Sequence, residues 1–218
     1  MFRFKTENIS HTNFPILFIS TLVFFIGISF FDSEKNGWLI NLLIFQVFAA
    51  GTYTISKDGQ VFKTAIVVGL IFVLLRLAEY FLNDEANVYL TLSIIFMAAF
   101  MAIILKNILT YLLITKVVNT NLILGVISGY LLIGVLFSFG FAITEVLTDG
   151  SAINFEGTPK FKDILYFTMV TQTTIGYGDF APVSDSARFL SYSLGVIGQL
   201  YMGIVMAFII GKFLQTSP

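Results

Sequence analysis

Residues 161–182 read FKDILYFTMVTQTTIGYGDFAP, a short apolar run that leads into a loop of Gly, Thr, Asp and Pro. The apolar part, Phe161 to Thr173, is too short to cross a membrane, because a helical span needs about 20 residues for about 30 Å of hydrocarbon. It predicts a re-entrant helix followed by a non-helical loop, Thr174 to Pro182. Such a loop is tolerated at membrane depth only where protein buries it or where it lines a water-filled path.

Long apolar stretches lie on both sides of this segment. Of the 218 residues, 57% are hydrophobic and 11% charged, whereas soluble domains carry about 25% charged residues. This composition excludes a soluble enzyme and indicates a chain that crosses a membrane several times. Six stretches of spanning length are present, at about Phe14–Phe31, Trp38–Ile55, Thr64–Leu82, Val88–Leu105, Leu122–Leu147 and Arg188–Phe213.

The order of these stretches predicts the fold class. We expect an all-α membrane protein with six transmembrane helices, and with the re-entrant helix and its loop between the fifth and the sixth. The segment Lys106–Asn121 is more polar and is expected to connect the fourth span to the fifth. This divides the chain into a four-helix domain, 1–118, and a second domain that contains the re-entrant segment, 119–218.

The Lys and Arg residues of the short loops predict the orientation, because basic residues favour the cytoplasmic side. With both termini cytoplasmic, seven basic residues lie inside and four outside. The protein is therefore expected in the cell membrane as a multi-pass protein in contact with membrane lipids. The inner set is Arg3, Lys5, Lys57, Lys63, Lys106, Lys116 and Lys212, and the outer set is Lys35, Lys160, Lys162 and Arg188.

The loop sequence Thr173-Thr174-Ile175-Gly176-Tyr177-Gly178-Asp179 carries the chemistry. Rings of backbone carbonyls, together with a hydroxyl, replace the hydration shell of a K⁺ ion in a selectivity filter. Successive carbonyls reach one axis only if the backbone leaves ordinary helix and strand geometry, which the glycines at 176 and 178 permit. Between them Tyr177 would turn outward, while the hydroxyl of Thr174 would face a cavity.

The loop resembles the pore signature of potassium channels, T-V-G-Y-G-D, with Ile175 in place of the usual Val. The resemblance extends over about Leu122 to Phe213. It implies a selectivity filter that holds K⁺ as the permeant ion at Thr174, Ile175, Gly176 and Tyr177, and that ends at Gly178.

The resemblance also implies roles for residues around the filter. A pore-helix threonine that braces the filter tyrosine corresponds to Thr171, and the glycine of the gating hinge corresponds to Gly198. Two aromatic residues stand where the family often has tryptophans, and with Asp179 they are expected to support the filter. These two are Tyr166 and Phe167. Val170 stands where some members carry a buried Glu, so the pair of that Glu with the filter aspartate cannot form here.

One chain supplies one filter strand, and one strand cannot surround an ion. The carbonyl mechanism and the resemblance together imply a homotetramer with cyclic symmetry about the pore. The expected function is passive, K⁺-selective conduction, without enzymatic activity, without a cofactor and without a nucleic-acid partner.

The fourth stretch, Val88–Leu105, contains no Arg or Lys. Voltage sensing needs several basic residues in the membrane field, each worth about 2.3 kcal/mol per 100 mV. Steep voltage gating is therefore not expected.

Three other functions stay open at this point. A weakly selective cation channel would have the same loop, but its filter would not be held in an arrangement of four ion sites along the pore axis. A K⁺ uptake transporter uses similar loops, but typically has four pore repeats in one chain where this chain has one. A regulatory subunit with a vestigial pore would conduct no ions.

Overall fold

The computed structural model describes residues 13–31, 33–55, 59–82, 88–115, 118–157 and 159–216. Every regular element within these ranges is a helix, and no strand is present there. The helices are α1 (Phe14–Phe30), α2 (Ser33–Ile55), α3 (Gly59–Leu82), α4 (Val88–Ile114), α5 (Thr120–Leu147), α6 (Phe161–Gln172) and α7 (Asp185–Thr216). The prediction of an all-helical chain is confirmed for this part of the sequence.

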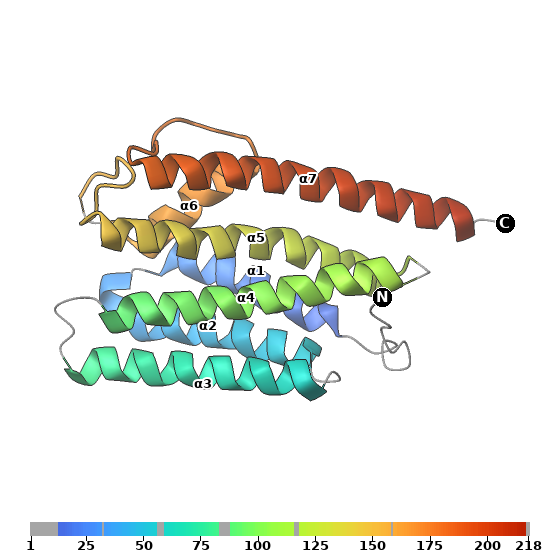
Figure 1. Ribbon diagram of the computed structural model, residues 1–218, viewed down its shortest axis with the longest axis horizontal. Coiled ribbons are helices and arrows are strands. Elements are labelled where there is room, and N and C mark those ends of the chain that lie inside the picture. The colour runs from blue at the N-terminus through green and yellow to red at the C-terminus, as the bar shows by residue number, and fades with distance from the viewer. Residues whose placement is uncertain are drawn as a thin grey trace.

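Helix α5 lies at the centre of the molecule. It contacts α1 and α4 on one side and α6 and α7 on the other. Helix α3 forms the far edge of the bundle, α7 forms the opposite edge, and the short α6 lies obliquely between α5 and α7 (Figure 1). The central helix thus joins the first four helices to the C-terminal part of the chain.

Three helices are long and apolar enough to cross a membrane, among the described residues. They are α4, α5 and the part of α7 from Asp185 to Lys212. Shorter apolar helical segments cover Phe14–Phe30, Leu39–Thr54 and Phe62–Leu75.

Helix α4 is longer than the sequence pattern predicts. The expectation that the fourth stretch ends at Leu105 and gives way to a polar connection is wrong, because α4 continues to Ile114. Its last turns are held by buried side chains at helical spacing, Ile108, Tyr111 and Leu112. Lys106 is therefore a helix residue, about 27 Å along α4 from Val88 at 1.5 Å per residue.

Four helix ends meet where α4 finishes. The backbone amide of Phe14 donates to Oδ1 of Asn121 at 3.1 Å, and the ring of Phe14 packs edge-on against Tyr111 with 5.0 Å between centroids. Lys212 Nζ donates to the carbonyl of Thr115 at 2.6 Å and also to that of Leu112. An ammonium group is favourable at these carbonyls because they form the negative end of the α4 dipole.

Glycines allow the helices to approach closely. Gly125 of α5 faces the ring of Phe14, and a Cβ atom built at this position would lie 2.8 Å from two ring carbons. Phe14 has no free space to move into, because its ring is 1% exposed and packs against Tyr111. Gly140 on the same helix faces only Leu190, at an ordinary 3.5 Å.

We predict that Gly125→Ala destabilises the protein and that Gly140→Ala does not. Overpacking costs about 1–3 kcal/mol, which exceeds the gain of about 1 kcal/mol from replacing Gly by Ala in a helix. A net loss of about 1 kcal/mol lowers the unfolding midpoint by about 2–4 °C in a chain of this size. Thermal unfolding in detergent, followed by circular dichroism, measures both midpoints. Equal midpoints for the two variants would contradict the packing argument.

Candidate functional site

Helix α6 has a defined start and a buried face. Asp163 accepts a hydrogen bond from the backbone amide of Lys160 at 3.1 Å, which satisfies an amide that the helix leaves free and puts negative charge at its positive end. Phe161 packs on Phe139 of α5, with ring centroids 5.4 Å apart. The prediction of a helix too short to span, beginning at Phe161, is confirmed to within one residue at its end.

The C-terminal end of α6 is fully hydrogen-bonded. A helix leaves its last four carbonyls without intrahelical partners, and here all four accept. The bonds run from Thr173 N to Met169 O (3.0 Å), Thr174 N to Thr171 O (3.1 Å), Ile175 N to Val170 O (3.0 Å) and Tyr130 Oη to Gln172 O (3.3 Å). The loop is therefore attached to α6 through its own first amides, and α6 is attached to α5 through Tyr130.

The sign of the backbone φ angle alternates along the loop. Thr174, Gly176 and Gly178 have positive φ angles of 61°, 57° and 79°, whereas Ile175 and Tyr177 between them do not. Two successive amides of the loop, those of Ile175 and Gly176, both point to Val170 O, at 3.0 and 3.3 Å. A row of carbonyls facing one way is the arrangement that coordinates a dehydrated cation.

Thr174 is the strained residue of this loop. A β-branched side chain rarely has positive φ, and such conformations cost about 1–3 kcal/mol and cluster at functional sites. The bond from its amide to Thr171 O, at 3.1 Å, holds the residue in this conformation.

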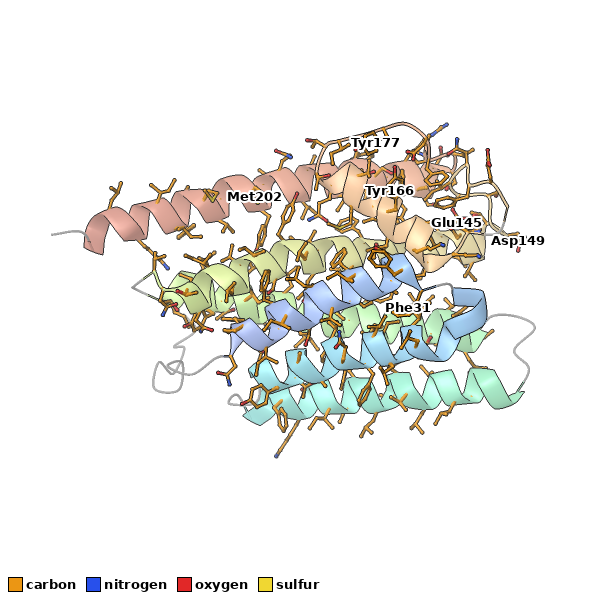
Figure 2. All side chains as sticks on the ribbon, turned by 180° about the vertical axis from the view of Figure 1, so that it is seen from behind. Phe31, Glu145, Asp149, Tyr166, Tyr177 and Met202 are labelled. Atoms are coloured by element: carbon orange, nitrogen blue, oxygen red, sulfur yellow. The ribbon has the colours of Figure 1, made fainter. Side chains whose placement is uncertain are left out.

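The loop is exposed in the single chain. Residues 173–179 are all exposed, with Tyr177 at 70% and Ile175 at 54%. In Figure 2, Tyr177 is labelled at the loop and Tyr166 below it, on α6. In the described part of the chain no hydrogen bond joins the Thr171 hydroxyl to Tyr177, so the bracing role of Thr171 stays a prediction.

Two of the predicted support residues meet. The hydroxyl of Tyr166 donates to Oδ2 of Asp179 at 2.7 Å, which ties the end of the loop back to α6. This hydrogen bond, chiefly, raises the pKa of the Tyr166 phenol above its ordinary value. Phe167 points the other way: it is buried against Phe141, with ring centroids 5.1 Å apart, and contributes to the packing of α6 on α5.

The segment after the loop is held by the α5–α6 connection. Ile153 forms an antiparallel bridge with Pro182, and Val183 N donates to Ala152 O at 2.8 Å. Glu145, in the last turn of α5, is 4% exposed and accepts from Ile153 N at 2.8 Å. The sequence analysis missed this role, although an acid inside a long apolar helix signals a structural or functional site.

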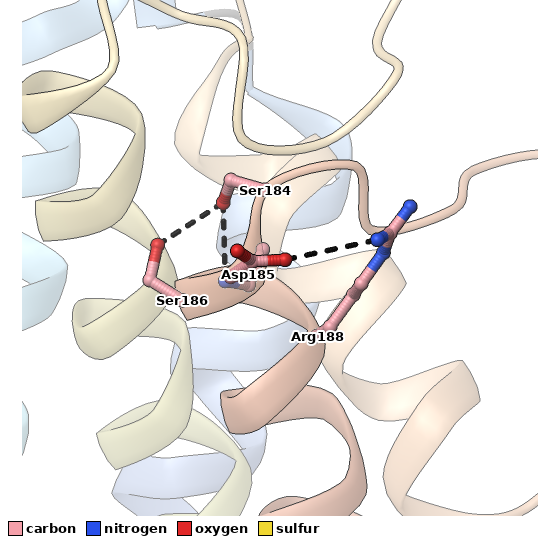
Figure 3. Close-up of polar contacts among 5 residues, drawn as sticks. Ser184, Asp185, Ser186 and Arg188 are labelled. Carbon is pink, nitrogen blue, oxygen red and sulfur yellow. Dashed lines mark hydrogen bonds and ion pairs between the residues drawn. The ribbon is translucent and has the colours of Figure 1, made fainter.

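Helix α7 begins with a side-chain cap. The Ser184 hydroxyl accepts from Ala187 N at 3.1 Å and lies 3.0 Å from the Ser186 hydroxyl (Figure 3). Asp185 and Arg188 form an exposed ion pair at 3.8 Å, which contributes little to stability. The cap sets where the loop ends and the helix starts.

Gly198 lies against the end of α6. A Cβ atom built there would be 3.1 Å from Gln172 Cγ and 3.3 Å from Gln172 O, so the glycine permits a close approach of the two helices. Helix α7 is continuous through this residue, and its role as a gating hinge stays a prediction. The sequence analysis missed Gln172 and Tyr130, for which the available signal was a polar side chain within an apolar helix.

Comparison with known proteins gives a match in the C-terminal part of the chain, which contains α6 and the loop. Residues 130–215 match the family model described as "Ion channel". No solved structure matches the chain significantly.

The chain is also similar to three curated relatives over part of its length. The chain is 40% identical to two pore potassium channel b of Oryza sativa subsp. japonica over 50 residues, which are 23% of this chain and 14% of the relative. It is 36% identical to two pore potassium channel a of the same plant over 80 residues, 37% of this chain and 20% of the relative.

The third relative is the voltage-gated potassium channel Kch of Escherichia coli (strain K12), 33% identical over 89 residues, 38% of this chain and 21% of the relative. The matched segments thus span about a fifth or less of these relatives. Ion channels are not enzymes, in agreement with the composition. Residues 130–215 are therefore similar to ion channels, and the resemblance of the chain to potassium channels is confirmed.

Proposed function

We propose that this protein is a potassium-selective channel that conducts K⁺ passively through a filter formed by Thr174 to Gly178. The observation that carries the proposal is the alternating backbone of this loop, with positive φ at 174, 176 and 178. Its carbonyls supply the oxygen ligands that a K⁺ ion needs in place of water. Thr174, Ile175, Gly176 and Tyr177 coordinate the ion in this proposal.

A homotetramer follows from the geometry of coordination. One loop offers carbonyls on one side of an ion only, so a closed ring needs further copies of the chain. Two observations support this assembly. The loop of a single chain is exposed. In addition, only 22% of the apolar 18-residue stretch of α7 is buried, against 61% of the corresponding stretch of α5. The uncovered apolar surface of α7 is available for neighbouring subunits and for lipid.

Six membrane spans per subunit complete the proposal. The three shorter apolar helices, α1, α2 and α3, supplement the three long ones. The excess of Lys and Arg in the predicted inner segments favours cytoplasmic termini and a location in the cell membrane. The four-helix domain 1–118 and the pore domain 119–218 meet just before Asn119, whose side chain caps α5 by accepting from Leu122 N at 2.8 Å.

Steep voltage dependence is not part of this function. The full length of α4, Val88 to Ile114, contains Lys106 as its one basic residue. One charge that crosses the whole field contributes about 2.3 kcal/mol per 100 mV, and steep gating needs several such charges.

Reversal potentials test the selectivity directly. With the purified protein in planar bilayers, replacing K⁺ by Na⁺ on one side should shift the reversal potential toward the K⁺ equilibrium value. A near-zero shift would indicate a weakly selective cation channel, and absence of current in liposome flux assays would indicate a non-conducting subunit. Either result contradicts the proposal.

We predict that Gly178→Ala lowers the K⁺ preference, whereas Gly150→Ala leaves it unchanged. Both glycines have a φ of 79° with no atom near a built Cβ, so both substitutions cost a similar 1–2 kcal/mol, roughly, in backbone strain. Only the substitution at Gly178 strains the backbone of the proposed filter. The K⁺/Na⁺ permeability ratio should drop by about tenfold or more, since tenfold corresponds to about 1.4 kcal/mol. Equal ratios for the two variants would contradict the assignment.

The bond between Tyr166 and Asp179 predicts an alkaline limit to conduction. Because the folded protein raises the pKa of the phenol, the stabilising bond is complete below the ordinary tyrosine pKa of about 10. It is lost as the pH rises through the raised value. Sustained K⁺ current should be constant between about pH 7 and 9 and fall above about pH 10.

Two Tyr→Phe variants, each lacking one phenol hydroxyl, test whether Tyr166 causes the alkaline decline in current. Tyr166→Phe should reduce sustained current already at neutral pH and remove the alkaline decline. Tyr192→Phe, which deletes another exposed phenol, should keep the decline. An unchanged pH profile in Tyr166→Phe would show that the bond does not support conduction.

A further inference from the structure

Gln172 occupies the junction of three helices. It is the last residue of α6, directly before the loop, and its side chain is 0% exposed. A fully buried amide in apolar surroundings is costly unless it is hydrogen-bonded, so its contacts carry information about its role.

Two hydrogen bonds join Gln172 to one residue of α5. Its Nε2 donates to the backbone carbonyl of Tyr130 at 2.7 Å. In return, the hydroxyl of Tyr130 donates to the backbone carbonyl of Gln172 at 3.3 Å. Side chain and main chain of Gln172 are both attached to α5, which fixes the last turn of α6 in position and in rotation.

Glycines on both neighbouring helices make room for this side chain. A Cβ atom at Gly134 of α5 would lie 2.6 Å from Gln172 Oε1, and one at Gly198 of α7 would lie 3.1 Å from Gln172 Cγ. Gln172 therefore fills the space between α5 and α7 at the level where the loop begins.

The amide makes one hydrogen bond in the part of the chain that the structure describes. Oε1 is buried there without a donor, so the bond from Nε2 to Tyr130 accounts for the polar anchoring of the side chain. An apolar side chain of similar length would keep the packing and lose the anchor.

We propose that Gln172 is the positioning residue of the loop 173–178: it sets the place of the loop relative to α5 and α7, and thereby its ion selectivity. The first loop amides donate hydrogen bonds to the carbonyls of the last turn of α6. Gln172 in turn fixes this last turn to α5 through its hydrogen bonds with Tyr130. The inference rests on the proposed function, because it assigns a residue that controls the geometry of the proposed filter.

The first test compares two glutamines. Gln172→Met should lower the K⁺/Na⁺ permeability ratio, measured from reversal potentials in bilayers, by about tenfold, a coupling within the usual range between neighbouring groups. Gln46→Met is the matched control, because Gln46 Nε2 of α2 also donates to a backbone carbonyl, that of Ser20, at 2.9 Å. It should leave the ratio unchanged.

The second test approaches Gln172 from its neighbours. Gly198→Ala presses on Gln172 and should lower the ratio, while Gly195→Ala and Gly203→Ala, with no atom within 4 Å of a built Cβ, should not. The double variant Gln172→Met with Gly198→Ala should lose less than the product of the single effects, because both act on one contact.

Tyr130→Phe keeps the inference testable if Gln172→Met fails to assemble, as judged by gel filtration. It removes one oxygen and one of the two bonds, and should lower the ratio to a smaller degree. Unchanged selectivity in the assembled Gln172→Met protein, or in Tyr130→Phe, would overturn the inference. So would equal effects of the alanines at 195 and 198. A wild-type protein without K⁺ preference would instead overturn the proposed function.

Discussion

The hydrogen bonds at the C-terminal end of α6 are the constraint on which the rest of this site depends. The loop that follows has alternating φ angles, including a positive φ at the β-branched Thr174, and an isolated peptide would not hold this backbone. It persists because the first loop amides bond to α6 carbonyls and because Asp179 accepts from Tyr166 at the other end of the loop. The loop is thus fixed at both ends to one short helix.

The elements around α6 explain how that helix is held in turn. Tyr130 binds its last residue, and the rings of α5 pack against its buried face. On the far side of the loop, Glu145 holds the segment around Ile153, which bridges to Pro182 before the capped start of α7. The central position of α5 among the helices follows from these roles, because it supplies anchors at both the beginning and the end of the loop.

The C-terminal part of the chain and the first four helices differ in the contacts that hold them together. In the C-terminal part, polar side chains fix the backbone at single residues, as Gln172 and Glu145 do. In the described part of the first four helices, glycines lie opposite bulky side chains, as Gly27 does opposite Leu43 and Gly69 opposite Phe48. The parts are joined where Asn121, Thr115 and Lys212 bring the ends of α1, α4, α5 and α7 together. The proposed filter and the four-helix domain therefore share α5 as a common support.

The sequence by itself determined the helical class, the short α6 and the identity of the loop, because these depend on local composition, run length and glycine spacing. It also indicated the potassium channel resemblance, since that rests on a contiguous motif. It did not determine the end of α4, which continues past Lys106 because Ile108, Tyr111 and Leu112 are buried by neighbouring helices. Only the tertiary structure decided which polar residues meet: Gln172 with Tyr130, Glu145 with Ile153, and Lys212 with the end of α4. These pairs are 42, 8 and about 100 residues apart, and distant partners such as the first and the last are brought within hydrogen-bond distance by helix packing, which local sequence patterns do not encode.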